Sequence, residues 1–198
     1  AAVMFPLLTP TLLAGVAGSL QQRVALARGE ATALAWRQGA NRAPIAGDLW
    51  EQPALTEVRT LLAAPSTEHL TLAAELLAES RAHALARNSN RRLIEIDALL
   101  ALVLAAQADR GGALAALQAA VERAAPGGAL RLLVDCGPGL IGLLQELKAA
   151  GVAPSYIQQV LAAFDVSAMS LPAAQPGPVQ PAPAPAAAAP CAGRRRAG

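Results

Sequence analysis

Apolar residues recur every three or four positions through most of the chain, which is the spacing of an amphipathic helix. The first such run begins near Thr11 and ends near Gly29, and a shorter one covers residues 30–38. Residues 39–53, GANRAPIAGDLWEQP, are rich in turn-forming residues and predict a loop. A further short helix is expected over residues 55–63.

The middle of the chain gives the clearest helical pattern. Ser66 or Thr67 can cap a helix that continues to the NSN turn at residues 88–90. The next helix is predicted over residues 92–107, and a return helix follows over residues 113–124 after the turn ADRGG. Two helices joined by so short a turn form an antiparallel hairpin.

The composition favours an all-α fold. Hydrophobic residues make up 54% of the 198 positions but aromatic residues only 3%. Alanine and leucine supply most of the apolar residues, and both favour helices, whereas strand formers are scarce. We therefore expect a helical domain over residues 1–165. Residues 166–198 are mostly proline and alanine, and are expected to form an extended, disordered linker or tail.

The helical hairpin also fits a tetratricopeptide-like repeat. In such a repeat, small residues allow two helices to approach closely and large residues fill the groove between neighbours. The segment at residues 21–38 has a similar order of helix, glycine-containing turn and helix. Two imperfect units favour an array of helix hairpins, a solenoid, over a closed bundle. The residues that can occupy the small and large repeat positions are Leu100, Ala101, Leu104, Ala113, Leu117 and Ala120, with Pro126 after the second helix.

Charge and cysteine usage exclude several classes of protein. The net charge of +2 is too small for a nucleic-acid- or membrane-binding field over the whole surface. Cys136 and Cys191 show neither zinc-ligand spacing nor a disulfide framework, so we expect a reducing compartment, the cytoplasm. The apolar residues 1–20 lack a preceding basic region and contain two prolines, which favours a capping helix over a membrane span.

One motif suggests a nucleotide site. Gly137, Gly139 and Gly142 spell G-x-G-x-x-G, and the short β-like run 132–134 precedes them. A dinucleotide fold needs parallel strands upstream and a further strand ending in an acidic residue, and the helical pattern supplies neither. Pro138 is better explained as a residue in the first turn of a helix. We therefore predict no nucleotide site here.

The other candidate residues are better explained by a structural role than by a catalytic or metal-binding one. Cys136 precedes a helix, but it has no histidine near it in sequence, so a small packed side chain is the favoured interpretation. His69 and His83 are separated by roughly 21 Å along one helix and cannot share a metal ion. Glu95 and Asp97 are two residues apart and point to different faces, so they form no acid–base pair. No catalytic residue, metal or cofactor is predicted, and the chain is not expected to be an enzyme.

Basic residues cluster at only two places in the sequence. Arg91 and Arg92 begin one predicted helix, and residues 194–196, RRR, lie in the tail. No aromatic residues interleave the tail triplet, so a solvated tail is favoured over a nucleic-acid site.

An ordered series of segments resembles a known family. The segments are LARGEATALAW, the IEI helix, AQADRGGALAAL, RLLVDCGPGLIGLL and YIQQVLAAF, and together they span roughly residues 21–164. They resemble the helical-repeat region of large ATP-dependent LuxR-type (MalT-like) transcriptional regulators. Such regulators also have an ATPase module and a DNA-binding helix-turn-helix. This chain contains no G-x-x-x-x-G-K-[ST] motif and no helix-turn-helix after its proline-rich stretch.

The resemblance implies a role in transcription regulation and signalling. In that role the repeats bind a protein partner or a small-molecule inducer and couple this binding to self-association. DNA would be contacted only through a domain outside this chain, and no membrane is involved. The alternative is a free-standing helical-repeat scaffold for protein–protein interaction.

Overall fold

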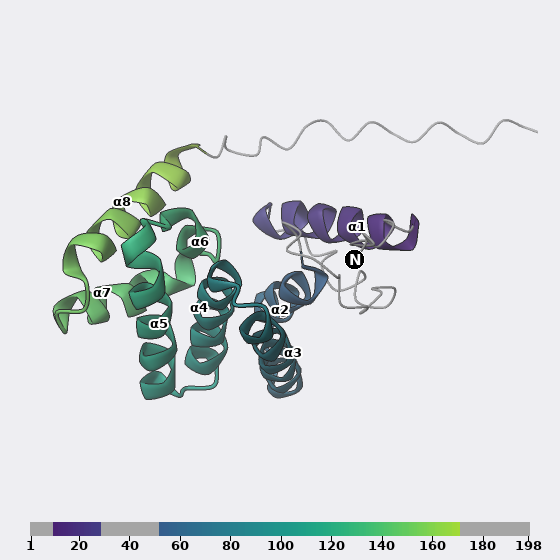
Figure 1. Ribbon diagram of the computed structural model, residues 1–198, viewed down its shortest axis with the longest axis horizontal. Helices are drawn as coiled ribbons and strands as arrows, with labels where there is room; N and C mark the ends of the chain where they lie inside the picture. The colour runs from purple at the N-terminus through teal and green to yellow at the C-terminus, as the bar shows by residue number, and fades with distance from the viewer. Residues whose placement is uncertain (1–9, 29–51, 171–198) are drawn as a thin grey trace, which may run out of the picture.

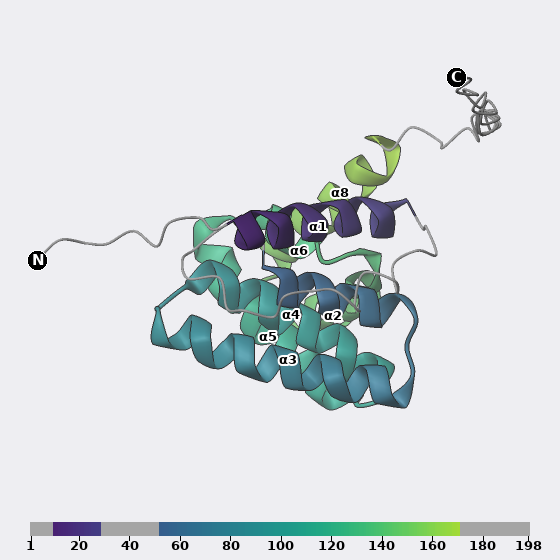
Figure 2. The same ribbon diagram turned by 90° about the vertical axis from the view of Figure 1, so that its right-hand side faces the viewer.

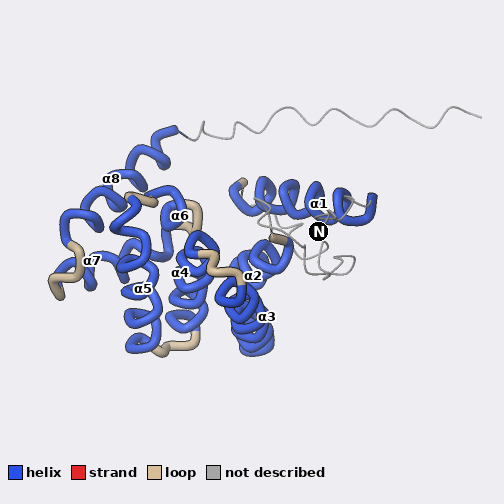
Figure 3. The backbone as a smooth tube through the Cα atoms, in the orientation of Figure 1, coloured by secondary structure: helices blue, strands red, loops and turns tan. Residues whose placement is uncertain are grey.

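The computed structural model describes residues 10–28 and 52–170, and within these ranges the chain forms helices and no strand (Figure 3). The predicted helix 30–38, most of the predicted loop 39–53 and residues 171–198 lie outside the described residues. Among the helices described, none is both long and apolar enough to cross a membrane.

Three helices form the N-terminal half (Figure 1): α1 (Pro10–Ala27), α2 (Pro53–Ala63) and α3 (Thr67–Ala86). Pro53 opens α2 at a first-turn position, where a missing N–H costs nothing. Ser66 caps α3 by accepting a hydrogen bond from the backbone N–H of His69 at 3.1 Å, as the sequence predicts. Helix α1 packs on α2, and α2 packs on α3.

The helices α4 (Asn90–Ala106) and α5 (Arg110–Ala124) form the predicted antiparallel hairpin and contact each other most extensively. Their turn is fixed by local chemistry. Asp109 accepts a hydrogen bond from the backbone N–H of Gly112 at 2.9 Å and so caps α5. A Cβ atom at Gly112 would lie 2.3 Å from a carboxylate oxygen of Asp109, so any other residue there would force the capping side chain of Asp109 to move.

The C-terminal part contains shorter elements. The 3-10 helix η2 (Ala125–Gly127) ends α5, α6 (Leu130–Val134) follows, and η3 (Pro138–Leu140) leads into α7 (Ile141–Ala149). The β-like run expected at residues 132–134 is therefore helical. The last helix, α8 (Pro154–Ser170), packs on α6 and α7 and continues past residue 165, where the sequence placed the domain boundary.

One continuous apolar core joins α2 to α8. Helix α4 lies at its centre, because it contacts α2, α3, α5 and α6. Tyr156 on α8 donates a hydrogen bond from its hydroxyl group to the carbonyl oxygen of Ala129 at 3.3 Å, which ties the last helix to the start of α6. The largest fully buried side chains are Leu55, Leu61, Leu77, Ile96, Leu99, Leu117, Leu133, Leu140, Leu143, Leu144, Ile157 and Val58.

The predicted repeat positions lie in this core. Ala101, Ala113, Leu117 and Ala120 are fully buried. Leu100 and Leu104 are partly buried and pack against the core. Small residues therefore lie within the α4–α5 hairpin, where close approach of two helices requires them.

Candidate functional site

The first half of α4 buries several charged side chains. Residues 92–99 are all buried, although they include three charged side chains, Arg92, Glu95 and Asp97. Charged residues are seldom buried unless they are paired. This segment is therefore the first place to look for a functional site.

Glu95 lies between two arginines from different helices. One carboxylate oxygen accepts a hydrogen bond from Arg59 Nη2 of α2 at 2.6 Å, and the other accepts one from Arg92 Nη1 at 3.0 Å. All three side chains are nine-tenths buried or nearly so. We call Arg59, Arg92 and Glu95 the inner triad.

Asp97 forms a second, outer triad. One carboxylate oxygen accepts a hydrogen bond from Arg81 Nε of α3 at 3.1 Å, and the other accepts one from Arg123 Nη1 of α5. Glu95 and Asp97 thus have different partners on different faces of α4, as their spacing predicts. The two triads connect α4 to α2, α3 and α5.

The triads are suited to holding helices together. Each carboxylate has both oxygens bonded to arginine, so each is held between two cations. No group of three or more potential metal ligands occurs in the described ranges 10–28 and 52–170. Breaking a buried ion pair leaves an uncompensated charge, so these contacts fix the relative positions of the helices.

Cys136 lies beside the inner triad but is not an activated nucleophile. Its thiol is buried and donates a hydrogen bond to the carbonyl oxygen of Leu132 at 3.2 Å. Burial raises the pKa of the Cys136 thiol to about 12, although the neighbouring Arg59 guanidinium opposes this rise. A protonated thiol is a poor nucleophile, which fits the expected packing role.

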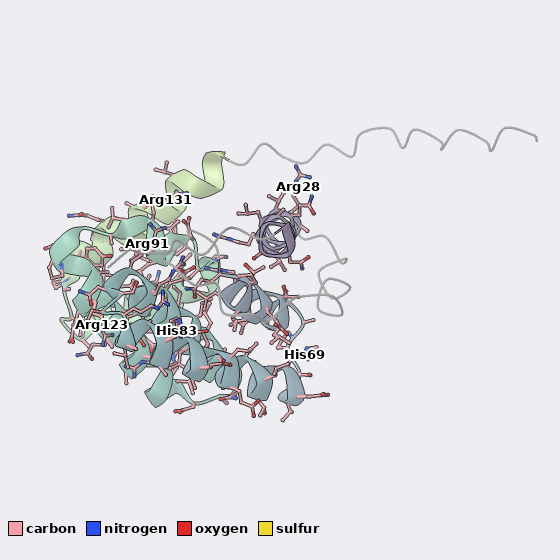
Figure 4. All side chains as sticks on the ribbon, turned by 45° about the vertical axis from the view of Figure 1, so that its right-hand side comes forward. Arg28, His69, His83, Arg91, Arg123 and Arg131 are labelled. Carbon is pink, nitrogen blue, oxygen red and sulfur yellow. The ribbon has the colours of Figure 1, made fainter. Side chains whose placement is uncertain are left out.

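The two histidines lie apart on α3 (Figure 4). His69 is near the N-terminus of the helix, where its Nδ1 lies 2.6 Å from the carbonyl oxygen of Ala64 and links α3 to the end of α2. His83 is in the last turn and is exposed. Nothing in this arrangement brings the two side chains together.

The glycine motif lies at a turn between helices. Gly137 has a positive φ of 109°, and Pro138 begins the short helix η3, in keeping with its predicted first-turn role. The preceding residues form α6, so the strand that a dinucleotide fingerprint needs is replaced by a helix.

The basic residues of the described part do not form one cluster. Arg91 is exposed while its neighbour Arg92 is buried in the inner triad. Arg110 is half exposed and pairs with Glu146, joining α5 to α7. This hydrogen bond holds the pKa of Glu146 below its usual value. Cys191 and the arginines at 194–196 lie outside the described residues.

The arginine partners of the two carboxylates were not predicted from the sequence. Arg59, Arg81 and Arg123 lie on three separate helices, and a single sequence does not reveal which acids they meet. One feature of the sequence does indicate that Glu95 and Asp97 are buried with cationic partners: they lie among apolar residues in RRLIEIDALL. Carboxylates in so apolar a helix need buried cationic partners.

Comparisons of this chain with protein-family models, with curated proteins and with solved structures found no match.

Proposed function

We propose that this chain is the effector- or partner-binding helical-repeat region of a LuxR-type, MalT-like transcriptional regulator. In this proposal the ATPase and DNA-binding functions belong to other parts of the regulator. The chain itself binds a protein or a small-molecule inducer on its helical surface and performs no catalysis.

The order in which the helices contact one another carries this proposal. Consecutive helices pack in pairs from α2 to α5, and alternate helices also touch: α2 contacts α4, α4 contacts α6, and α5 contacts α7. An array of stacked helix hairpins requires this pattern, because each unit buries its apolar face against the next. The fully buried alanines at 101, 113 and 120 add support, since they occupy the predicted small positions of the repeat.

Such an array can pass a binding event along the molecule. Each unit contacts only its neighbours, so a ligand that bridges two units stabilises one arrangement of the stack over others. The two triads around α4 would hold the central units in register during this change. Self-association could then be favoured in the bound arrangement alone.

The direct test is to determine the coding sequence on both sides of this segment. We expect a G-x-x-x-x-G-K-[ST] motif upstream and a helix-turn-helix of the LuxR type downstream, in one open reading frame. A short gene that encodes only these helices would contradict the regulator proposal. It would favour the free-standing scaffold instead.

A further inference from the structure

The outer triad differs from the inner triad in how far its arginines reach into water. The side chains of Arg81 and Arg123 are 41% and 30% exposed, although both are bonded to the buried carboxylate of Asp97. The arginines of the inner triad, at positions 59 and 92, are only 12% and 5% exposed. The outer triad therefore places two guanidinium groups, and one positive charge in excess of its carboxylate, at the surface.

Both arginines of the outer triad keep donors for a further anion. Arg81 binds Asp97 through Nε, and Arg123 binds it through Nη1. A guanidinium group carries five N–H donors, and neither side chain has another hydrogen-bond or ion-pair partner within the part of the chain that the structure describes. Asp97 also holds the two groups in place, so an anion would meet cations that are already ordered.

Two further arginines lie at the same end of the helices. Arg87 follows the last residue of α3, and Arg91 lies in the first turn of α4. Both are exposed, and neither forms an ion pair within the described ranges. Six positions separate Arg87 from Arg81, and six separate Arg91 from Asp97, which is about 9 Å along a helix. The turn between α3 and α4 projects at one end of the molecule (Figure 2), so a partner can approach these cations there.

The acidic residues nearest to these arginines in the sequence do not neutralise them. Glu79 is exposed on α3 and forms no ion pair among the described residues. Glu122 on α5 accepts a hydrogen bond from Gln118 Nε2 at 2.7 Å. His83, exposed in the last turn of α3 (Figure 4), adds no negative charge. This end of the molecule therefore keeps an excess of positive charge.

An exposed leucine lies among these cations. Leu85 is 48% exposed. It follows Arg81 by four positions, which places both side chains on one face of α3, and it precedes Arg87 by two. Phosphate groups offer a leucine nothing to pack against, whereas a protein segment can offer carboxylates and an apolar side chain together. We call Arg81, Leu85, Arg87, Arg91 and Arg123 the cationic end.

We propose that the cationic end is a docking surface for an acidic segment of a partner protein, in which apolar residues lie between carboxylates. This proposal names a partner class for the binding role proposed above and rests on it. The carboxylates of the segment pair with the arginines, and its apolar residue packs on Leu85. Complementary charge brings the segment to this end, and the leucine distinguishes it from other anions.

The test measures the binding of a labelled acidic peptide, EELEELEE, by fluorescence anisotropy at low ionic strength. The matched peptide EESEESEE keeps the charge and lacks the apolar residues. Every protein chain carries Arg194→Gln, Arg195→Gln and Arg196→Gln, so that these three arginines cannot bind the peptide. The chain with these three changes alone is the parent.

Two double variants of the parent remove the same charge at different ends of the helices. Arg87→Gln with Arg91→Gln removes two exposed cations that form no ion pair, so it should not disturb the helices. Arg110→Gln with Lys148→Gln is the control. Arg110 begins α5, about 20 Å along the helix from Arg123, and is bonded to Glu146 of α7, two positions from Lys148.

We expect EELEELEE to bind the parent saturably and to bind the Arg87→Gln, Arg91→Gln chain at least ten times more weakly. Its affinity for the control chain should stay within twofold of the parent value. The parent should bind EESEESEE at least three times more weakly than EELEELEE. Leu85→Ser should abolish this preference, because the apolar contact is then absent from both complexes.

Three results would overturn the proposal. The first is no saturable binding, or an equal loss of affinity in the control chain. The second is displacement of the peptide by inorganic phosphate or duplex DNA where sodium chloride of equal ionic strength has no effect, because the cationic end would then be a general anion site. The third is no preference for EELEELEE over EESEESEE.

One segment of this chain, DLWE at residues 48–51, also has apolar residues between two carboxylates. Asp48→Asn with Glu51→Gln tests whether it occupies the cationic end. We expect the affinity for EELEELEE to be unchanged, and a tenfold rise would overturn the proposal by identifying this segment as the occupant. All these failures concern the cationic end and leave the coding-sequence test of the regulator proposal unaffected.

Discussion

At the scale of single residues, the sequence predicts that the two carboxylates of α4 point to different faces, but it does not predict which residues pair with them. The spacing of Glu95 and Asp97 correctly places them on different faces of one helix. Their burial follows from the apolar residues around them. Their partners come from α2, α3 and α5, and pairings over 16 to 36 positions cannot be obtained from local spacing.

Removing the charge of Glu95 tests the inner triad. Glu95→Gln keeps the shape of the side chain but leaves Arg59 and Arg92 as buried cations without their shared anion. We expect the free energy of unfolding to fall by about 3–5 kcal/mol. Urea denaturation followed by circular dichroism measures this change.

The matched control is Glu146→Gln, which also removes a carboxylate bonded to arginine. Glu146 and Arg110 are each half exposed, so water already screens their interaction. Glu146→Gln should lower the free energy of unfolding much less than Glu95→Gln does. Equal losses for the two variants would contradict the structural role of the inner triad.

Cys136 gives a second prediction at this scale. With its pKa raised to about 12, the thiol is almost entirely protonated at pH 8, and it is also buried. In a Cys191→Ser chain, a disulfide reagent such as dithionitrobenzoate should react with Cys136 only after denaturant is added, because the thiolate is the reactive form. Complete labelling of the folded protein within seconds would instead identify Cys136 as an accessible, activated thiol.

At the scale of elements, helical periodicity and capping residues are enough to locate most helices of the described part. The predicted ranges 55–63, 92–107 and 113–124 fall on α2, α4 and α5, because each combines an apolar stripe with a nearby turn signal. The run at 132–134 was misleading. Three leucine and valine residues resemble a strand when read alone, but they belong to the short helix α6, which packs against α4 and α8.

The α4–α5 hairpin yields a prediction about packing. Ala101 and Ala113 are both fully buried, and the repeat pattern predicts that they face each other across the hairpin. Ala113→Leu should overpack this site and lower the free energy of unfolding by roughly 1–3 kcal/mol. Ala115→Leu, on the exposed side of α5, is the matched control and should change it little. If chemical denaturation gives the same small change for both, close packing at Ala113 is ruled out.

At the scale of the whole molecule, the sequence predicts an all-helical chain because alanine and leucine dominate its apolar residues. It does not predict which side of α1 faces the protein. Among the α1 side chains that the structure describes, those of residues 17–26 and 28, Ser19 and Gln22 are the buried ones, whereas Leu20 and Val24 are each 49% exposed. The spacing of apolar residues cannot predict a polar interface, because such a prediction takes the apolar side of a helix to be the buried side.

The central proposal for this molecule is that it binds a partner or an effector and leaves DNA recognition to another module. In the described ranges, exposed arginine and asparagine side chains gather at residues 87, 88, 90 and 91, in the turn before α4 and its first two residues, and not along the length of one helix face as in a base-reading helix. Any DNA binding by this chain should therefore come from the arginines at 194–196. Three cations can neutralise at most about three phosphates, which limits the salt slope of binding to a magnitude of roughly 2.7.

The most direct measurement is a salt titration of binding to several unrelated DNA duplexes. It compares the full chain, a chain without residues 171–198 and a full-length chain with Arg194→Gln, Arg195→Gln and Arg196→Gln. We predict weak binding by the full chain with no sequence preference, and loss of binding in both variants. Sequence-selective, salt-resistant binding that survives in both variants would contradict the claim, because a DNA-reading surface would then lie among the helices.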